Sequence, residues 1–261
     1  MVRQMKYNAS LGSFDAQTCY DRIAHSFLSL VAQAVGTPQP LIVCMLKAIQ
    51  NMKLYLRTGY GDSDRYYCSK DILQPYQGAV QGNGAAPALW LLISSFLLKY
   101  MEGGGHFLNI KSALTATRLI FTALMFVDDT DFPIYAESPQ ESIASIAHRQ
   151  QTTVDSWSHG LTVSGGSLKP EKCFWYPIEW TWTNGIAKAT PAKDIEDDIA
   201  EKDPEGQMKN ISKLDYDHAK EILGVFQAPS GQMNSQLQKL EGTREKFIPV
   251  LTKKYLPQEL V

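Results

Sequence analysis

Two adjacent carboxylates, Asp128 and Asp129, follow an apolar run at residues 119–127 and are well suited to bind a cation. Burying one unpaired carboxylate is costly, and burying two side by side costs more, unless a cation or a solvated turn compensates. The pair therefore predicts either a metal site or an exposed hairpin tip. The dipeptide alone does not decide, because a second pair, Asp197–Asp198, lies in a stretch with the composition of an acidic loop.

Four other stretches can be set beside this pair. They are FDAQTCYDRI (14–23), GAVQGNGAAP (78–87), GLTVSGGSLKPEKCFWY (160–176) and EILGVFQAP (221–229). Together with FVDD (126–129), their order and spacing resemble the palm of a reverse transcriptase of the non-LTR retrotransposon type. The resemblance extends over roughly residues 12–230 of the sequence. It implies an RNA-directed DNA polymerase domain, a nucleotidyltransferase that adds deoxynucleotides to a primer 3′-hydroxyl on an RNA or DNA template.

The resemblance assigns Asp15, Asp128 and Asp129 as catalytic carboxylates and metal ligands. Two Mg²⁺ ions, for which Mn²⁺ can substitute, would stabilise the attacking and leaving oxygens of the reaction. Mg²⁺ prefers oxygen ligands and keeps several waters, so two or three carboxylates are sufficient. Asp15 also has a simpler interpretation as the N-cap of a following helix. Asp131 lies outside the motif, and we expect it on the surface or in a turn.

Three residues are assigned to the nucleotide by the same resemblance: Tyr20, Gln81 and Gly82. Tyr20 would fill the volume that a 2′-hydroxyl needs, which favours deoxynucleotides. Gln81 and Gly82 lie in a glycine-rich loop, and glycine allows close backbone approach. The alternatives are a core aromatic residue for Tyr20 and an ordinary turn before a helix for the loop.

Lys172 resembles the lysine that protonates the departing pyrophosphate, and such general-acid help is typically worth about 10²–10⁴-fold. Lys169 is close enough in sequence to compete for this role, and either lysine could simply be solvated. Leu223 and Gly224 resemble the turn of a primer grip, with a plain β-turn as the alternative.

The composition is that of a globular protein, with 44% hydrophobic residues among 261 and a net charge of −2. No overall basic field attracts nucleic acid, so contacts would be local. The four cysteines show no metal-binding spacing and indicate reduced thiols. No signal peptide is visible, and the apolar stretch 87–98 is too short to span a membrane. We expect an intracellular protein, nuclear or cytoplasmic, with no membrane partner.

The predicted elements alternate helices with strands and indicate an α+β fold. We expect an antiparallel palm sheet with a ferredoxin-like core, backed by helices and followed by a short C-terminal helical segment. We predict helices at 18–35, 41–52, 87–101 and 138–160, the last with Ser138 as N-cap and Gly160 as stop, and a helix in the tail. We predict β-structure at 54–67, 113–127, 171–185 and 219–229.

The apolar run before Asp128 is expected to be the first strand of a hairpin buried under the sheet. Residues 191–207, rich in acidic side chains, are expected to form a solvated loop outside the core. The resulting division is a palm at 1–190, an acidic loop or insertion at 191–212, and a primer-grip hairpin with the start of a thumb at 213–261.

Three functions remain open from the sequence. The resemblance implies a polymerase, but its family carries a basic fingers region before the first motif, and this sequence starts almost at Asp15. We therefore expect a retroelement fragment lacking fingers. A catalytically inactive remnant, acting at most as a nucleic-acid-associated or interaction module, is the main alternative. A metal enzyme acting on free nucleotides is the third, and the primer-grip match argues against it.

Overall fold

The computed structural model describes residues 6–17, 19–68, 77–80, 82–112, 114–115, 117–203 and 205–252. Its helices are α2 (His25–Ala34), α3 (Gln39–Gln50), α4 (Ala86–Gly103), α5 (Ile143–Ser164) and α6 (Asn234–Thr252), with a 3-10 turn η1 (Ala192–Asp194). The strands of the main sheet are β1 (Ala9–Asp15), β6 (Leu124–Phe126), β7 (Asp129–Tyr135), β8 (Phe174–Ile178) and β13 (Ser212–Lys213).

Five two-stranded ribbons complete the described elements. They are β2 (Leu54–Thr58) with β3 (Gly61–Tyr67), β4 (Leu108–Lys111) with β5 (Arg118–Phe121), β9 (Trp180–Thr183) with β10 (Ile186–Ala189), β11 (Ala200–Lys202) with β12 (Met208–Asn210), and β14 (Lys220–Ile222) with β15 (Val225–Gln227). The expected α+β class is therefore confirmed.

The main sheet has the strand order β13-β8-β1-β7-β6, with β1 at its centre. β1 pairs antiparallel with both β7 and β8, whereas the short edge strand β13 runs parallel to β8. The expectation of an antiparallel sheet therefore holds for four of the five strands. All residues of β8 (FWYPI) are buried, as expected of a strand covered on both faces.

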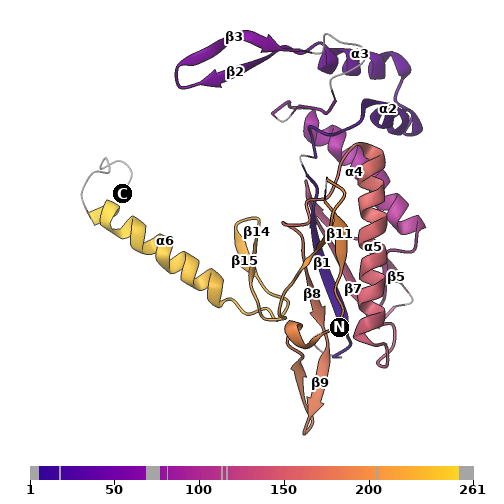
Figure 1. Cartoon of the computed structure of the whole chain (residues 1–261), viewed down its shortest axis with the longest axis vertical. Coiled ribbons are helices and arrows are strands. Elements are labelled where there is room, and N and C mark those ends of the chain that lie inside the picture. Colours follow the sequence, from indigo (N-terminus) through magenta and orange to yellow (C-terminus); the bar gives the residue numbers. More distant parts are fainter. Residues whose placement is uncertain are drawn as a thin grey trace.

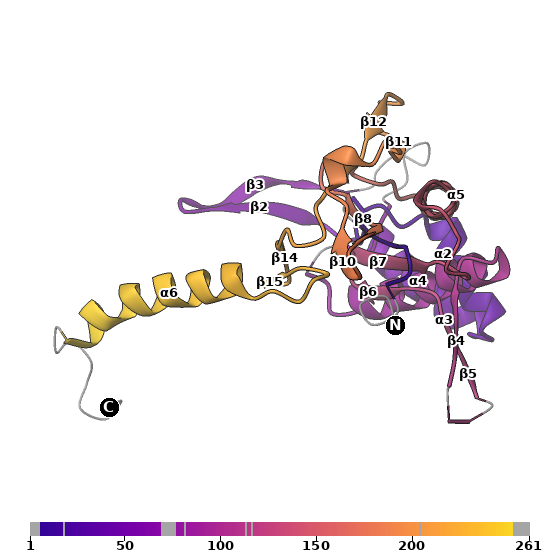
Figure 2. The same cartoon turned by 90° about the horizontal axis from the view of Figure 1, so that it is seen from below.

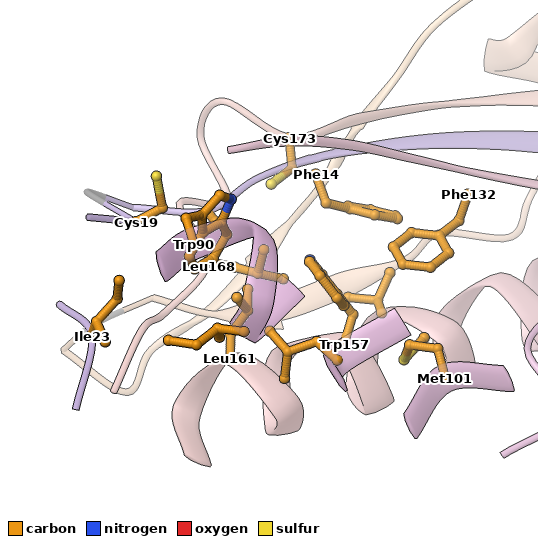
Figure 3. Packing of buried hydrophobic residues seen from close by; sticks show 14 of the residues in the cluster. Phe14, Cys19, Ile23, Trp90, Met101, Phe132, Trp157, Leu161, Leu168 and Cys173 are labelled. Atoms are coloured by element: carbon orange, nitrogen blue, oxygen red, sulfur yellow. The ribbon is translucent and has the colours of Figure 1, made fainter. Parts of the chain in front are cut away.

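Helices α4 and α5 cover one face of this sheet (Figure 1), and the main core lies between these helices and the sheet. Phe14 of β1 and Phe132 of β7 project toward Trp157 of α5, as Figure 3 shows. The rings of Phe132 and Trp157 meet edge to face with centroids 5.4 Å apart, and both side chains are almost fully buried. The aromatic core fixes which side chains of β1 and β7 face the helices, because side chains alternate along a strand.

The opposite face of the sheet carries a smaller cluster next to the ribbon β14–β15. Its buried members are Ala9, Phe174, Tyr176 and Ile178, and Ile222 of β14 packs against them. Toward the carboxyl end of β1 the same face holds polar side chains instead, including Asp15 and Asp129. Figure 2 shows that α6 and the ribbon β2–β3 project from the side of the sheet away from α5.

The predicted helix at 18–35 begins later than expected, at His25. The residues before it are held by other parts of the chain: the amide of Gln17 donates to Ser167 O, and that of Ala24 donates to Ser164 O. These tertiary hydrogen bonds replace helical ones, so the segment forms turns.

The helix predicted at 138–160 lies four residues further along the chain. Ser142 is the N-cap, with its Oγ accepting from the amide of Ser145, and Gly165 at φ +96° ends the helix. Gly160 lies inside the helix, where a Cβ would come 3.3 Å from Leu97 of α4. Gly160 therefore allows α4 and α5 to pack closely and does not end the helix.

Two expectations about burial are wrong. β6 is an edge strand in which Leu124 and Phe126 are exposed, because it has a strand neighbour on one side only. The acidic segment 191–207 contributes Ile199, which is fully buried in the main core. Acidic residues dominate the composition of this segment, but its apolar residue Ile199 packs in the core.

The remaining predicted elements agree in type with the structure. The apolar run 113–127 is divided between β5 and β6, which pair with different strands, and 219–229 forms the ribbon β14–β15 and not a single strand. Among the described residues, no helix combines the length and apolar character that a membrane span needs.

Candidate active site

The paired aspartates lie at the tight turn between β6 and β7. Val127 and Asp128 form the turn, with Val127 at φ +57°, and Asp129 is the first residue of β7, paired with Phe126. The indole Nε1 of Trp90 donates to the carbonyl of Val127 over 2.5 Å. This bond ties the turn to α4 and fixes its unusual backbone conformation.

Asp15 lies directly opposite Asp129 in the antiparallel pairing of β1 with β7. The amide of Ala16 donates to the carbonyl of Asp128 over 3.1 Å, which extends the pairing to the turn. Directly opposed residues share one face of a sheet, so Asp15 and Asp129 lie on the face away from the aromatic core. Thus the backbone brings Asp15 next to a pair of aspartates, Asp128 and Asp129, that lies far from it in the sequence.

The segment that follows α5 brings two lysines to the same place. The amide of Lys169 donates to the carbonyl of Asp15 over 3.1 Å, so this segment continues along the end of β1. The Nζ of Lys172 donates to Oδ2 of Asp15 over 3.2 Å. Lys169 instead has its Nζ 3.7 Å from Glu171. Of the two candidate lysines, Lys172 is the one that contacts a motif carboxylate.

A cavity of about 300 Å³ opens at this point. Its lining combines carboxylates, both lysines and an aromatic ring: Asp15, Gln17, Cys19, Tyr20, Asp21, Val127, Asp128, Lys169 and Lys172. A larger groove, lined by Trp180, Lys188 and Asp215, lies toward the opposite end of β1 and includes none of the predicted site residues. We regard the smaller cavity as the candidate site because the titratable groups converge there.

Burial and like charge raise the pKa of two carboxyls on this face. For Asp129 the causes are partial burial, then the charges of Asp128, Asp15 and Asp131, opposed by Lys172. For Asp131 the main cause is burial, opposed by a hydrogen bond from Ser13. The expectation that Asp131 is a surface or turn residue is wrong, since it lies within β7 opposite Ser13.

The pKa values of one lysine and two cysteines near the carboxylates are also raised. The hydrogen bond and charge of Asp15 raise the pKa of Lys172, so the ammonium form is favoured. Burial raises the pKa of Cys19 and of Cys173 to about 12, so both remain protonated thiols. Neither cysteine is suited to act as a nucleophile.

Tyr20 lines the cavity and is positioned by the glycine-rich loop. The amide of Ala79 donates to the carbonyl of Tyr20 over 2.7 Å, and Gly78 packs so closely that a Cβ would lie 2.5 Å from Asp21 O. Gly82 has φ +93° and open space around its Cα, whereas Gln81 lies outside the described residues. The first half of the loop therefore has a structural role in holding Tyr20.

Leu223 and Gly224 form the turn of the ribbon β14–β15, at φ +51° and +80°. The Nζ of Lys239 in α6 donates to the carbonyl of Gly224 over 2.6 Å and pairs with Glu221. The predicted primer-contacting turn is thus attached to α6, and it does not line the cavity.

The carboxylates suit a hard cation by their chemistry, because oxygen ligands are those Mg²⁺ prefers. Asp15 and Asp128 line one cavity, and Asp129 is close enough for their charges to raise its pKa. Among the described residues, no group of three His, Cys, Asp or Glu side chains forms a ready-made metal site. The carboxylate oxygens are nevertheless ligands of the type that Mg²⁺ prefers, and one or two carboxylates are enough for an ion that keeps several of its waters.

Gln17, Asp21 and Asp131 were not predicted as parts of this region. Asp131 stands two residues after Asp129, and in a strand that spacing places both side chains on one face. Its position beside Asp129 could therefore have been predicted from the sequence. Gln17 and Asp21 reach the cavity through turns fixed by tertiary hydrogen bonds. No local sequence pattern identifies them.

No protein-family model and no curated protein sequence matches the chain. Among solved structures, the chain is similar to apo telomerase from Candida tropicalis, truncated from its C-terminal domain, with a TM-score of 0.42 and 14% sequence identity. The alignment covers 80% of this chain and 37% of the telomerase chain. A similarity of this size does not establish a shared fold, and the chain spans well under half of that protein.

Proposed function

We propose that the chain is an RNA-directed DNA polymerase domain of the non-LTR retrotransposon type, with the main sheet as its palm. One observation carries this proposal: Asp15 lies opposite Asp129, with Asp128 in the adjoining turn. Two of the motifs that suggested a polymerase, one with Asp15 and one with the paired aspartates, thus come from separate segments and meet at one end of β1. Lys172, whose Nζ donates to Asp15, brings a third motif to the same point.

In this proposal Asp15 and Asp128 hold divalent cations, with Asp129 beside them. The cations would stabilise charge on the phosphate undergoing transfer. Tyr20 forms a wall of the cavity against the sugar, and its position depends on the bond from Ala79. Lys172 leaves Asp15 and donates a proton to the departing pyrophosphate.

Primer extension on an RNA template, with Mg²⁺ or Mn²⁺ and deoxynucleotides, tests the proposal. Asp15→Asn and Asp128→Asn each remove a charge while keeping side-chain size, and each should abolish extension. Asp197→Asn, from the other Asp–Asp pair, is the matched control and should extend primers like the unchanged chain. Equal extension by all variants would show that the carboxylates of β1 and the turn are not the catalytic ones.

The same assay separates the alternatives. An inactive remnant would extend no primer with either metal, even though the fold is intact by circular dichroism. An enzyme acting on free nucleotides would incorporate deoxynucleotides without primer and template.

A further inference from the structure

The ribbon β2–β3 is a second feature with the chemistry to bind a ligand. Its strands pair with each other and with no other strand of the described chain, and it extends away from the body (Figures 1 and 2). A bulge between Tyr55 and Arg57 interrupts its register. Such a ribbon has no core of its own, and several of its large side chains are exposed, among them Tyr55, Leu56 and Tyr60.

Two tyrosine rings form a pair on this ribbon. Tyr55 and Tyr66 are opposed across the strands, with ring centroids 5.6 Å apart and an angle of 53° between the rings. Tyr55 is 52% exposed and Tyr66 is 37% exposed. A cross-strand aromatic pair also stabilises a ribbon, but that role alone does not require so much exposed ring surface.

One cation lies over the pair, and two arginines belong to the same ribbon. The Nζ of Lys53 lies 4.7 Å from the centroid of the Tyr66 ring, and Arg65 precedes Tyr66 in β3. Arg57 follows close behind Tyr55, with its guanidinium held by two hydrogen bonds to Asp62 at 2.6 and 3.0 Å. Exposed rings with basic neighbours are typical of surfaces that stack bases and contact phosphates, whereas the centre of a protein–protein interface is depleted in charge.

The ribbon is attached next to the candidate site. It is preceded by α3 in the chain, and residues 77–80, which contact the carbonyls of Tyr20 and Ile23, come a short way after it. The ribbon and α6 project from the same side of the molecule, away from α5 (Figure 2). A nucleic-acid strand that occupies the cavity and leaves it on that side would therefore pass close to the ribbon β2–β3.

We propose that the ribbon β2–β3 binds single-stranded nucleic acid, with bases stacked on the Tyr55–Tyr66 pair and phosphates contacted by Lys53 and Arg65. This binding does not depend on the polymerase activity proposed above. A chain that fails to extend primers can still bind through the ribbon, so the two proposals fail separately.

Fluorescence anisotropy with a labelled oligo(dT) of about 15 nucleotides tests this inference, beside an abasic strand of the same length. The abasic strand has the same phosphates and no bases. The unchanged chain should bind oligo(dT) about tenfold or more tightly than the abasic strand. Tyr55→Ala combined with Tyr66→Ala should abolish that preference while the abasic strand binds as before.

Two controls keep the test specific. Trp182→Ala removes an exposed aromatic from another ribbon, β9–β10, and should leave the preference unchanged. The pair Tyr55→Phe and Tyr66→Phe keeps both rings and should bind like the unchanged chain, which separates loss of stacking from loss of the ribbon. A double alanine variant that retains the preference, or a duplex that competes as well as the single strand, would overturn the proposal.

Discussion

Asp131 is a partly buried carboxyl whose Oδ1 has no hydrogen-bond partner among the described residues. Burial raises its pKa above 3.8, so the folded chain binds more protons than the unfolded chain between 3.8 and the raised value. The free energy of unfolding therefore falls as the pH rises through that interval. Above it, the folded chain bears the full cost of burying the ionised Asp131 carboxylate.

We predict that Asp131→Asn stabilises the protein by about 1 kcal/mol at pH 7, because the penalty of burying a charge is removed. Below pH 3.8 the gain should vanish, since both states are then protonated. Urea unfolding at several pH values measures this. A gain that is constant across the pH range would contradict burial of the charge as its cause.

Lys172 is the cation bonded to Asp15, and its replacement tests a role in catalysis. We predict that Lys172→Met slows primer extension by about 10²–10⁴-fold, because the ammonium is the only proton donor assigned to the leaving group. Lys169→Met removes the same charge from the same cavity without breaking the bond to Asp15. Single-turnover rates should fall much more for Lys172→Met, and equal losses would point to a general charge effect.

At the scale of elements, Gly78 joins the glycine-rich loop to the turn that carries Tyr20. Its φ of +84° and the backbone of Asp21, which would lie 2.5 Å from a Cβ, both exclude a side chain. We predict that Gly78→Ala lowers the free energy of unfolding by about 3 kcal/mol. Gly82→Ala has the strained φ but open space and should cost about 1 kcal/mol.

Gly84 completes this series, since it has neither a positive φ nor a neighbour near its Cβ position. Gly84→Ala should leave stability within about 0.5 kcal/mol. Equal effects of the three alanines in urea unfolding would mean that the loop does not pack against Asp21.

Ile199 ties the acidic segment to the core. We predict that Ile199→Ala costs about 2–5 kcal/mol, because it leaves a cavity among fully buried side chains. Ile186→Ala, on an exposed residue of β10, should change stability by less than about 0.5 kcal/mol. Thermal unfolding compares the two, and a small effect at Ile199 would restore the solvated-loop interpretation.

The sequence predicted elements whose signal is local. The apolar helix α4 and the aromatic strand β8 follow from composition alone. The start of α2 and the burial of Ile199 could not be predicted, because both depend on contacts with distant segments. Among the site residues, the family resemblance of the motifs indicated Asp15 and the Asp pair, but only strand register shows that they meet.

At the scale of the whole molecule, the sheet separates an aromatic core from a face that holds the carboxylates. Helices α4 and α5 cover the face with the aromatic core, and the ribbon β2–β3 and α6 project beyond the other face (Figures 1 and 2). The half-buried carboxylates lie at one end of β1, beside the cavity. In the polymerase proposed above, this is the end of the sheet that a primer and template would have to reach.

In the proposed polymerase, Asp15 and Asp128 jointly hold a divalent cation. Mn²⁺ binding followed by electron paramagnetic resonance, in the presence of a deoxynucleoside triphosphate, tests it most directly. We predict that Asp15→Asn and Asp128→Asn each weaken protein-dependent Mn²⁺ binding by at least about tenfold, whereas Asp197→Asn does not. Mn²⁺ binding of the same strength in all four proteins would contradict it.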